Sequence, residues 1–76
     1  MEILIDNEKC KTVNTLKTLA TFLPIRAKTL CFADLHKYIS EELSHNKRLS
    51  FTRVDEGVWG IQLDGESVIM VFEKES

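Results

Sequence analysis

Apolar and polar residues alternate at the start of the chain and follow a helical repeat through its middle. From Glu2 to Asp6, the side chains of Ile3 and Ile5 fall on one side of an extended backbone, with Leu4 on the other, which predicts a short strand. The polar run 6–9 predicts a turn. A second short strand over residues 10–13 fits the pattern less well.

The next segment has the spacing of an amphipathic helix. Its apolar positions recur at i, i+3, i+4 and i+7 and share one face: Leu16, Leu19, Ala20 and Leu23. Asn14 is a candidate N-cap, because its side-chain oxygen can accept from backbone amides of the first turn. Pro24 predicts the end of the helix, because a residue before proline disfavours the helical conformation. Phe22 lies off the apolar face, so we expect it to pack on the next helix or to face outward.

A second helix is predicted from about Thr29, a candidate N-cap, to about Ser44. Its apolar arc consists of Phe32, Leu35, Ile39 and Leu43, and the opposite side carries Asp34, Lys37 and Glu41. This pattern is typical of a helix that lies on a core. The alternative is a strand over residues 27–32 followed by a shorter helix.

The last third of the chain predicts a three-stranded antiparallel meander. Strand-like runs cover residues 48–54, 58–63 and 66–72. Asp64 and Gly65 between apolar runs indicate a type I′ hairpin, in which both central residues need a positive φ. The three-residue loop that ends at Gly57 suits a type I turn closed by a bulge.

These loop lengths predict a register for the meander. Pairing Leu63 with Glu66 sets Ile61 opposite Val68 and places Trp59 opposite Met70, while Val54 pairs with Val58. One face, predicted to receive the helices, would then carry Leu49, Phe51, Trp59, Ile61, Leu63, Val68, Met70 and Phe72.

The other face of the meander supplies the candidate interaction site. The same register groups five residues around Gly60: Thr52, Val54, Val58, Ile69 and Val71. Two interpretations remain open. Valine and isoleucine are favoured in half-exposed strands by β-propensity alone, or this face docks on another copy of the chain or on another protein.

Length and composition set the fold class. A chain of 76 residues is too short for two independent cores, and 43% hydrophobic with 29% charged residues is an ordinary globular balance. We therefore predict one α+β domain over residues 1–76, with an N-terminal strand, two helices and a three-stranded antiparallel meander packed on the helices.

The sequence also favours a cytoplasmic location. Acidic rather than basic residues precede the first apolar stretch, which is not the pattern of a signal peptide. No apolar run approaches the roughly 20 residues that cross a bilayer, so no membrane association is expected. In the cytoplasm Cys10 and Cys31 are expected to be reduced thiols.

Catalytic and metal chemistry is not indicated by the motifs. The spacing of Cys10, Cys31, His36 and His45 does not match the close ligand pairs of structural zinc sites. No nucleophile and base pair, phosphate loop or paired-carboxylate motif is present, so we predict neither an enzyme nor a bound metal or cofactor. His36 is expected to be a half-buried packing residue and His45 to lie in the following loop.

The net charge of −2 conceals an uneven distribution. Residues 9–37 contain one acid, Asp34, and six cations: Lys9, Lys11, Lys17, Arg26, Lys28 and Lys37. Residues 54–76 contain one cation, Lys74, and six acids: Asp55, Glu56, Asp64, Glu66, Glu73 and Glu75. A basic helical side and an acidic sheet end are therefore expected, a polarity that can orient an encounter with a charged partner.

Nucleic-acid binding is the alternative function. Two helices followed by a hairpin resemble a winged helix, with Arg26 and Lys28 placed to meet phosphate. The element order also resembles a KH domain, but the GxxG motif of that family is missing from residues 23–27. The six cations of residues 9–37 would form the contact surface, although they make no concentrated basic stripe.

The preferred prediction is a small non-enzymatic protein that works by contact. It would bind and regulate or inhibit another protein, as an inhibitor, an adaptor, or an antitoxin-like or immunity-like partner. A second copy of the chain is included among the predicted partners. The small size of the chain agrees with an origin in a phage or mobile element. The prediction rests on the missing catalytic motifs, the separated charges and the valine-rich sheet face.

Overall fold

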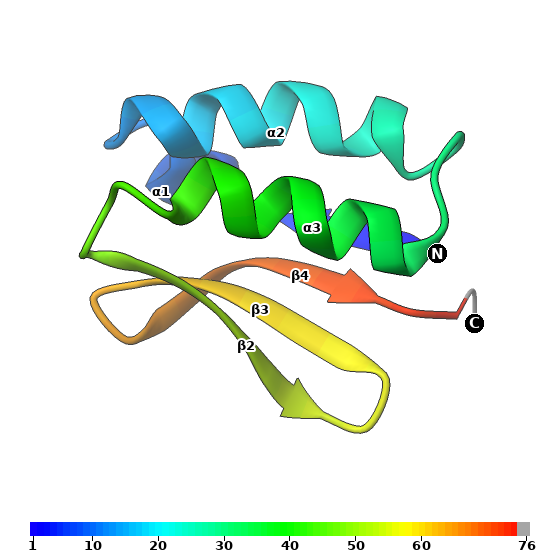
Figure 1. Cartoon of the computed structure of the whole chain (residues 1–76). Coiled ribbons are helices and arrows are strands. Elements are labelled where there is room, and N and C mark those ends of the chain that lie inside the picture. The colour runs from blue at the N-terminus through cyan, green and yellow to red at the C-terminus, as the bar shows by residue number, and fades with distance from the viewer. Residues whose placement is uncertain (75–76) are drawn as a thin grey trace.

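The computed structural model describes residues 1–74 and consists of a four-stranded antiparallel sheet with its helices on one side (Figure 1). The sheet order is β1-β4-β3-β2. In chain order the elements are β1 (Glu2–Ile5), α1 (Asn7–Cys10), α2 (Asn14–Arg26), α3 (Phe32–Leu43), β2 (Leu49–Asp55), β3 (Val58–Leu63) and β4 (Glu66–Phe72).

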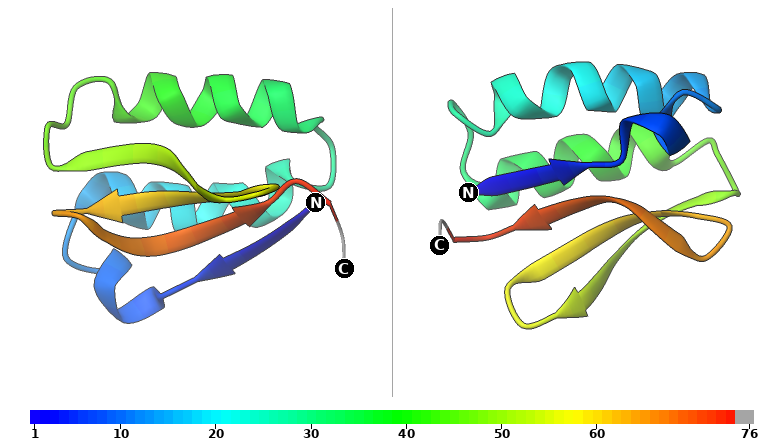
Figure 2. Two further views of the ribbon diagram at one scale, coloured as in Figure 1. Left: turned by 90° about the horizontal axis from the view of Figure 1, so that it is seen from below. Right: turned by 180° about the vertical axis from the view of Figure 1, so that it is seen from behind.

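The predicted fold class is confirmed. The N-terminal strand, two main helices and the antiparallel meander are all present, and β1 joins the meander by pairing with β4. Both long helices lie above the meander in Figure 1, and seen from below the strands lie in front of α2 while α3 runs beside β2 (Figure 2). The helices therefore cover one face of the sheet, and we call the opposite face the open face.

The core lies between the helical layer and the sheet. Each helix contributes side chains spaced by three or four residues, as the apolar repeat predicted. The buried apolar residues are Cys10, Leu16, Leu19, Leu23, Leu35, Ile39, Leu43, Leu49, Ile61, Val68, Ile69 and Val71.

Two local predictions before α2 are corrected. The turn predicted at residues 6–9 is a one-turn helix, because the Asp6 carboxylate accepts a hydrogen bond of 3.2 Å from the amide of Lys9. This turn carries Cys10 into the core. Residues 10–13 consequently form no strand, and the extended Val13 serves as the N-cap residue of α2, whose first residue is Asn14.

Helix α2 continues past Pro24 to Arg26, although the sequence predicted an end at the proline. Proline removes one amide donor, but the next turn keeps its bonds: the amide of Ala27 donates to the carbonyl of Leu23 at 2.8 Å. Leu23 is fully buried, so core packing holds it in the helical conformation that a following proline disfavours. Phe22 faces outward and is 45% exposed.

The segment between the helices is neither the predicted helix start nor a strand. The amides of Thr29 and Leu30 both donate to the carbonyl of Arg26, which extends the end of α2 as a turn. The Thr29 hydroxyl donates to the same carbonyl, so Thr29 is not an N-cap. Cys31 takes that position, and α3 begins at Phe32.

The three meander strands and the Asp64-Gly65 hairpin agree with prediction, but β2 begins and ends one residue later than predicted, so the β2–β3 turn has two residues, Glu56 and Gly57, instead of three. Asp64 and Gly65 have φ values of 52° and 87°, as a type I′ turn requires, and Leu63 pairs with Glu66. Gly57 has a φ of 68°. Val54 differs, because Asp55 takes its place opposite Val58 and leaves Val54 as the extra residue of a bulge.

The predicted register of β4 is wrong beyond its first two residues. Val68 is an extra residue between the pairs Gln62 with Ser67 and Ile61 with Ile69, so every later residue moves by one position. Trp59 therefore pairs with Val71 rather than Met70. This shift turns Ile69 and Val71 toward the helices and places Met70 and Phe72 on the open face.

Strand β1 gives the physical reason for the shift. Ile3 pairs with Val71 and Ile5 with Ile69, so four branched apolar residues share the face that the helices cover. The amide of Asp6 donates to the carbonyl of Val68 at 2.9 Å and holds the bulge in place. Pairing with β1, which the meander pattern alone did not include, thus decides which side of β4 enters the core.

Candidate functional site

The structure divides the predicted interaction residues between two faces. By their pairing, Thr52 and Val58 belong to the open face, and Val54 is 40% exposed beside them. Ile69 and Val71 are fully buried beneath the helices and are unable to meet a partner. The predicted interaction site is therefore corrected, because Ile69 and Val71 belong to the core and not to an exposed face.

The open face nevertheless carries an apolar patch, with different members. Leu4 pairs with Met70, and Phe72 pairs with Val58, so side chains of three neighbouring strands lie next to one another on this side. Leu4 is 53% exposed, and the other three are half-buried. We call Leu4, Val54, Val58, Met70 and Phe72 the open-face patch.

Gly60 lies near the middle of this face and explains how the patch is shaped. A Cβ atom at Gly60 would lie 2.9 Å from the Ser67 hydroxyl and 3.2 Å from a methyl carbon of Val54. Both side chains therefore close over the glycine backbone, which is buried. Glycine at this position allows Val54 to lean inward from the edge strand toward the other apolar side chains.

The two ends of the sheet differ in their charge pairing. At the β3–β4 hairpin, the Arg48 guanidinium contacts the Asp64 carboxylate at 2.7 Å, and Lys9 pairs with Glu66. At the end formed by the β2–β3 turn, none of the charged side chains Arg53, Glu56 and Lys74 has an ion-pair partner among residues 1–74. Charged side chains without an ion-pair partner among residues 1–74 thus gather at this end of the sheet.

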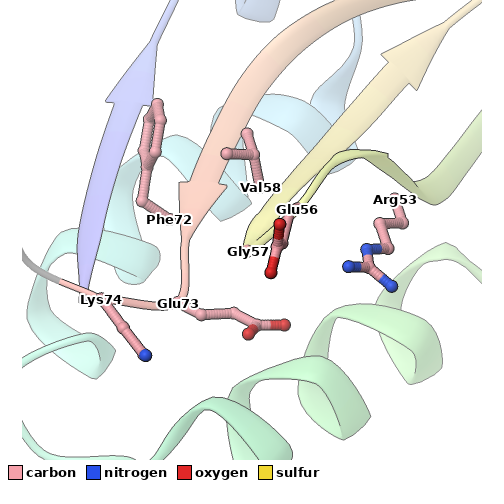
Figure 3. A pocket seen from close by; sticks show the side chains of 7 residues that line it. All are labelled: Arg53, Glu56, Gly57, Val58, Phe72, Glu73 and Lys74. Atoms are coloured by element: carbon pink, nitrogen blue, oxygen red, sulfur yellow. The ribbon is translucent and has the colours of Figure 1, made fainter.

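A hollow of about 500 Å³ occupies this second end (Figure 3). It is lined by Arg53, Glu56, Gly57, Val58, Phe72, Glu73 and Lys74. Val58 and Phe72 belong to the open-face patch, whereas Arg53 pairs with Trp59 and therefore lies toward the helical side of the sheet. Glu73 is held in place there, because its carboxylate accepts a hydrogen bond of 2.7 Å from the indole of Trp59.

Trp59 itself belongs to an aromatic cluster on the helical side of the sheet. Its ring stacks on Phe51 at a centroid distance of 5.3 Å, and His36 stands perpendicular to both rings at 5.0 and 5.1 Å. Phe32 completes the cluster at 5.7 Å from Trp59. Edge-to-face contacts of this kind stabilise packing, and His36 is half-buried as predicted.

The six cations predicted as an alternative contact surface are not brought together. Lys9 pairs with Glu66, and Lys11 contacts Glu8 at 3.2 Å. Arg26 lies over the ring of Tyr38, 5.5 Å from its centre. Lys17 and Lys28 line two different hollows, and Lys37 is exposed on α3. Half of these charges are therefore already in contact with other side chains.

The cysteines lie in different surroundings. Cys10 is buried, and loss of solvation, followed by the nearby Asp6 carboxylate, raises the pKa of its thiol. Cys31 is exposed, and its thiol donates to the Asp34 carboxylate at 3.2 Å. Within residues 1–74, no three His, Cys, Asp or Glu side chains are grouped closely enough to hold a metal ion.

Sequence reasoning missed three members of the open-face patch. For Leu4 a signal existed, because alternation in the first strand places it opposite Ile3 and Ile5, which are needed for the core. For Met70 and Phe72 the signal is hidden by the bulge at Val68. Glu73 had no sequence signal, since its contact with Trp59 depends on how the chain leaves β4.

No family model, curated protein or solved structure matches the chain. Among the described residues, no helix combines the length and the apolar character needed to span a bilayer.

Proposed function

We propose that this protein is a non-enzymatic interaction module that binds another protein through the open face of its sheet and so regulates or inhibits it. The observation that carries the proposal is the open-face patch: five apolar side chains on neighbouring strands, which no helix of residues 1–74 covers. Contiguous exposed apolar side chains are uncommon on monomers and are typical of binding surfaces.

The dimensions of the molecule agree with this role. Its principal extents are 28, 23 and 22 Å, so a whole face is comparable in size with the roughly 800 Å² that each partner gives to a standard interface. The patch offers Met70 and Phe72 on the inner strand β4, with Leu4 beside them on the edge strand β1, and charged groups lie at one end of the sheet. An apolar centre with a polar rim is the usual arrangement of a protein interface.

Protein is favoured over nucleic acid by the chemistry of the face. A phosphate backbone requires several free cations on one surface. Three of the six candidate cations are instead engaged by other side chains, and the patch is apolar. The nucleic-acid alternative gains no comparable support.

Paired substitutions test the proposal. Tagged wild-type protein is used to capture partners from an extract of the source cells, and bound proteins are identified by mass spectrometry. Leu4→Asp and Val54→Asp place charge on exposed positions of the open face, so each should reduce capture of the specific partner at least tenfold. Phe22→Asp is the matched control, because Phe22 is similarly exposed but lies on α2.

The outcomes separate clearly once circular dichroism shows that all variants are folded. Loss of the partner in the open-face variants alone supports the proposal. Equal capture by all variants, or loss with Phe22→Asp alone, contradicts it. The oligomeric state of the purified wild-type chain is measured in parallel by sedimentation. A dimer that dissociates in Leu4→Asp would show that the open face binds a second copy of the chain instead of a foreign protein.

A further inference from the structure

We infer that the outer edge of β2 binds an extended segment of a partner protein, which joins the sheet as a further strand antiparallel to β2. The inference goes beyond the proposed function, because it concerns an edge of the sheet and not its open face. It is carried by the direction of the backbone groups of β2, by the exposure of this strand and by the position of α3.

The hydrogen-bond pattern of the meander shows which backbone groups of β2 point out of the sheet. The amide of Asp64 donates to the carbonyl of Arg48 at 3.0 Å, so these residues form a hydrogen-bonded pair. In an antiparallel ladder such pairs alternate with pairs whose N–H and C=O groups point away from each other. By the register of β2 with β3, Phe51 and Arg53 therefore direct their N–H and C=O groups outward.

These outward groups have no backbone partner among residues 1–74. Strand β2 is the last strand of the order β1-β4-β3-β2, and no turn or loop of the described chain bonds to the backbone of Phe51 or Arg53. Five of the seven residues of β2 are exposed. Donors and acceptors that repeat at every second residue match an extended backbone, which satisfies both kinds of group at once.

The bulge at Val54 limits the length of the added strand. Regular pairing of β2 with β3 runs from Leu49 to Arg53, and the ladder is interrupted after that residue. A bulge bends its strand and increases the local twist, so a straight segment cannot follow the edge past it. The site therefore accepts about five residues, which is an ordinary strand length.

The side chains of β2 specify the chemistry of the segment. On the helical side Phe51 contacts Trp59 and His36 at centroid distances of 5.3 and 5.0 Å, yet Phe51 remains half-buried. A β-branched apolar residue opposite Phe51 would cover its ring. On the open face Thr52 is exposed, and a hydroxyl residue such as threonine fits beside it. The segment thus alternates apolar and hydroxyl residues.

A second copy of the chain does not fit this edge. Antiparallel pairing of two β2 strands relates the copies by a two-fold axis perpendicular to the sheet, so both helical layers lie on the same side. Helix α3 runs beside β2 (Figure 2), and its His36 contacts Phe51. Paired strands lie about 4.8 Å apart, whereas packed helices need about 8–10 Å, so the two α3 helices would collide. A single strand needs room only in the layer of the sheet.

An N-methylated peptide tests the inference with the purified full chain. The probe is acetyl-Thr-Val-Thr-Val-Thr amide with methyl groups on the three threonine nitrogens, so only one edge of the peptide can pair and it cannot assemble into extended sheets. The matched control carries methyl groups on the valine nitrogens as well, so neither edge can donate. Binding is followed by amide chemical shifts and by the fluorescence of Trp59, the only tryptophan, which stacks on Phe51.

We expect the probe to bind in the millimolar range or tighter, with shifts concentrated at residues 49–53. Arg53→Pro removes an outward N–H and no bond to β3, so the fold should persist while binding weakens about tenfold. Arg53→Ala is the matched control, because it removes the same side chain but keeps the N–H, and its affinity should stay within about twofold of wild type. Thr52→Pro should instead remove a bond to β3 and destabilise the fold.

The inference is overturned if the probe does not bind saturably in the millimolar range, if the fully methylated peptide binds equally, or if Arg53→Ala weakens binding as much as Arg53→Pro. Unfolding of Arg53→Pro but not of Thr52→Pro would contradict the assigned direction of the backbone groups. If neither proline variant folds, the two peptides decide the question alone. Failure here is distinguishable from failure of the proposed function, because Leu4 lies on β1 at the opposite edge of the sheet and Leu4→Asp should keep peptide binding.

Discussion

The indole N–H of Trp59 donates a hydrogen bond of 2.7 Å to the carboxylate of Glu73, across fourteen residues of chain. The amide of Glu73 also donates to the carbonyl of Gly57, so this residue is held through its backbone and its side chain. The contact ties the segment that leaves β4 to the aromatic cluster between α3 and the sheet. It therefore couples the end of the open face to the packing on the helical side.

Removing this carboxylate should affect both stability and the tryptophan signal. Glu73→Ala leaves the indole N–H without its partner, and we expect a loss of about 1 kcal/mol in the free energy of unfolding. The emission of Trp59 should shift as its surroundings change. Urea unfolding followed by fluorescence measures both. Glu56→Ala is the control, because it removes a nearby acid that does not contact Trp59, and an equal effect of the two substitutions would contradict the assigned role.

The bulge at Val68 predicts a difference between two neighbouring residues of β4. Ile69 is fully buried and Met70 is half-buried on the open face. Ile69→Ala should therefore cost about 2–5 kcal/mol, and Met70→Ala distinctly less. Chemical denaturation measures both. If Ile69→Ala does not fold, Ile69→Val with an expected cost of about 0.5–1.5 kcal/mol gives the comparison. A larger loss of stability for Met70→Ala than for Ile69→Ala would contradict the bulge and support the register predicted from the sequence.

The same bulge shows where reasoning from the sequence reaches its limit. Alternation and turn chemistry predict the three strands, the Asp64-Gly65 hairpin and the pairing of β2 with most of β3. Strand β4 is apolar on both sides, so alternation alone does not choose which side enters the core. That choice is made by β1, which is more than sixty residues away along the chain and aligns Ile3 and Ile5 with Ile69 and Val71.

The helix boundaries illustrate a second kind of limit. The apolar repeat located both helical cores, because burial of Leu19 or Ile39 depends only on spacing. Local propensity misplaced the ends, because tertiary packing of Leu23 overrides the effect of Pro24. The sequence predicted that one face of the sheet is left uncovered. It did not predict that Leu4, Met70 and Phe72 lie on that face, because their placement depends on long-range strand pairing.

The two cysteines should differ in reactivity. Burial removes Cys10 from solvent and raises the pKa of its thiol, so the reactive thiolate is scarce and inaccessible. Cys31 is exposed. Treatment of the native protein with iodoacetamide should therefore modify one cysteine quickly, identified as Cys31 by peptide mass spectrometry. In urea both should react. Rapid modification of Cys10 in the native protein would contradict its place in the core.

The pair of Arg48 and Asp64 should make stability depend on acid pH. Hydrogen bonding from the guanidinium, together with its charge, lowers the pKa of the Asp64 carboxyl below its ordinary value. The ionised carboxylate is therefore favoured in the folded state, and its contribution to stability is present above the unfolded pKa of about 3.9. This contribution is lost as the pH falls through the lower pKa of the folded state.

A double-mutant cycle isolates this contribution. Asp64→Asn, Arg48→Gln and the combined variant are unfolded in urea at pH 7 and at successively more acidic pH. We expect the coupling between the two positions to be measurable at pH 7 in low salt, to weaken at high salt because both side chains are exposed, and to vanish once Asp64 is protonated. Coupling that persists at the acidic limit would show that the two residues interact through packing of the hairpin end rather than through the ion pair.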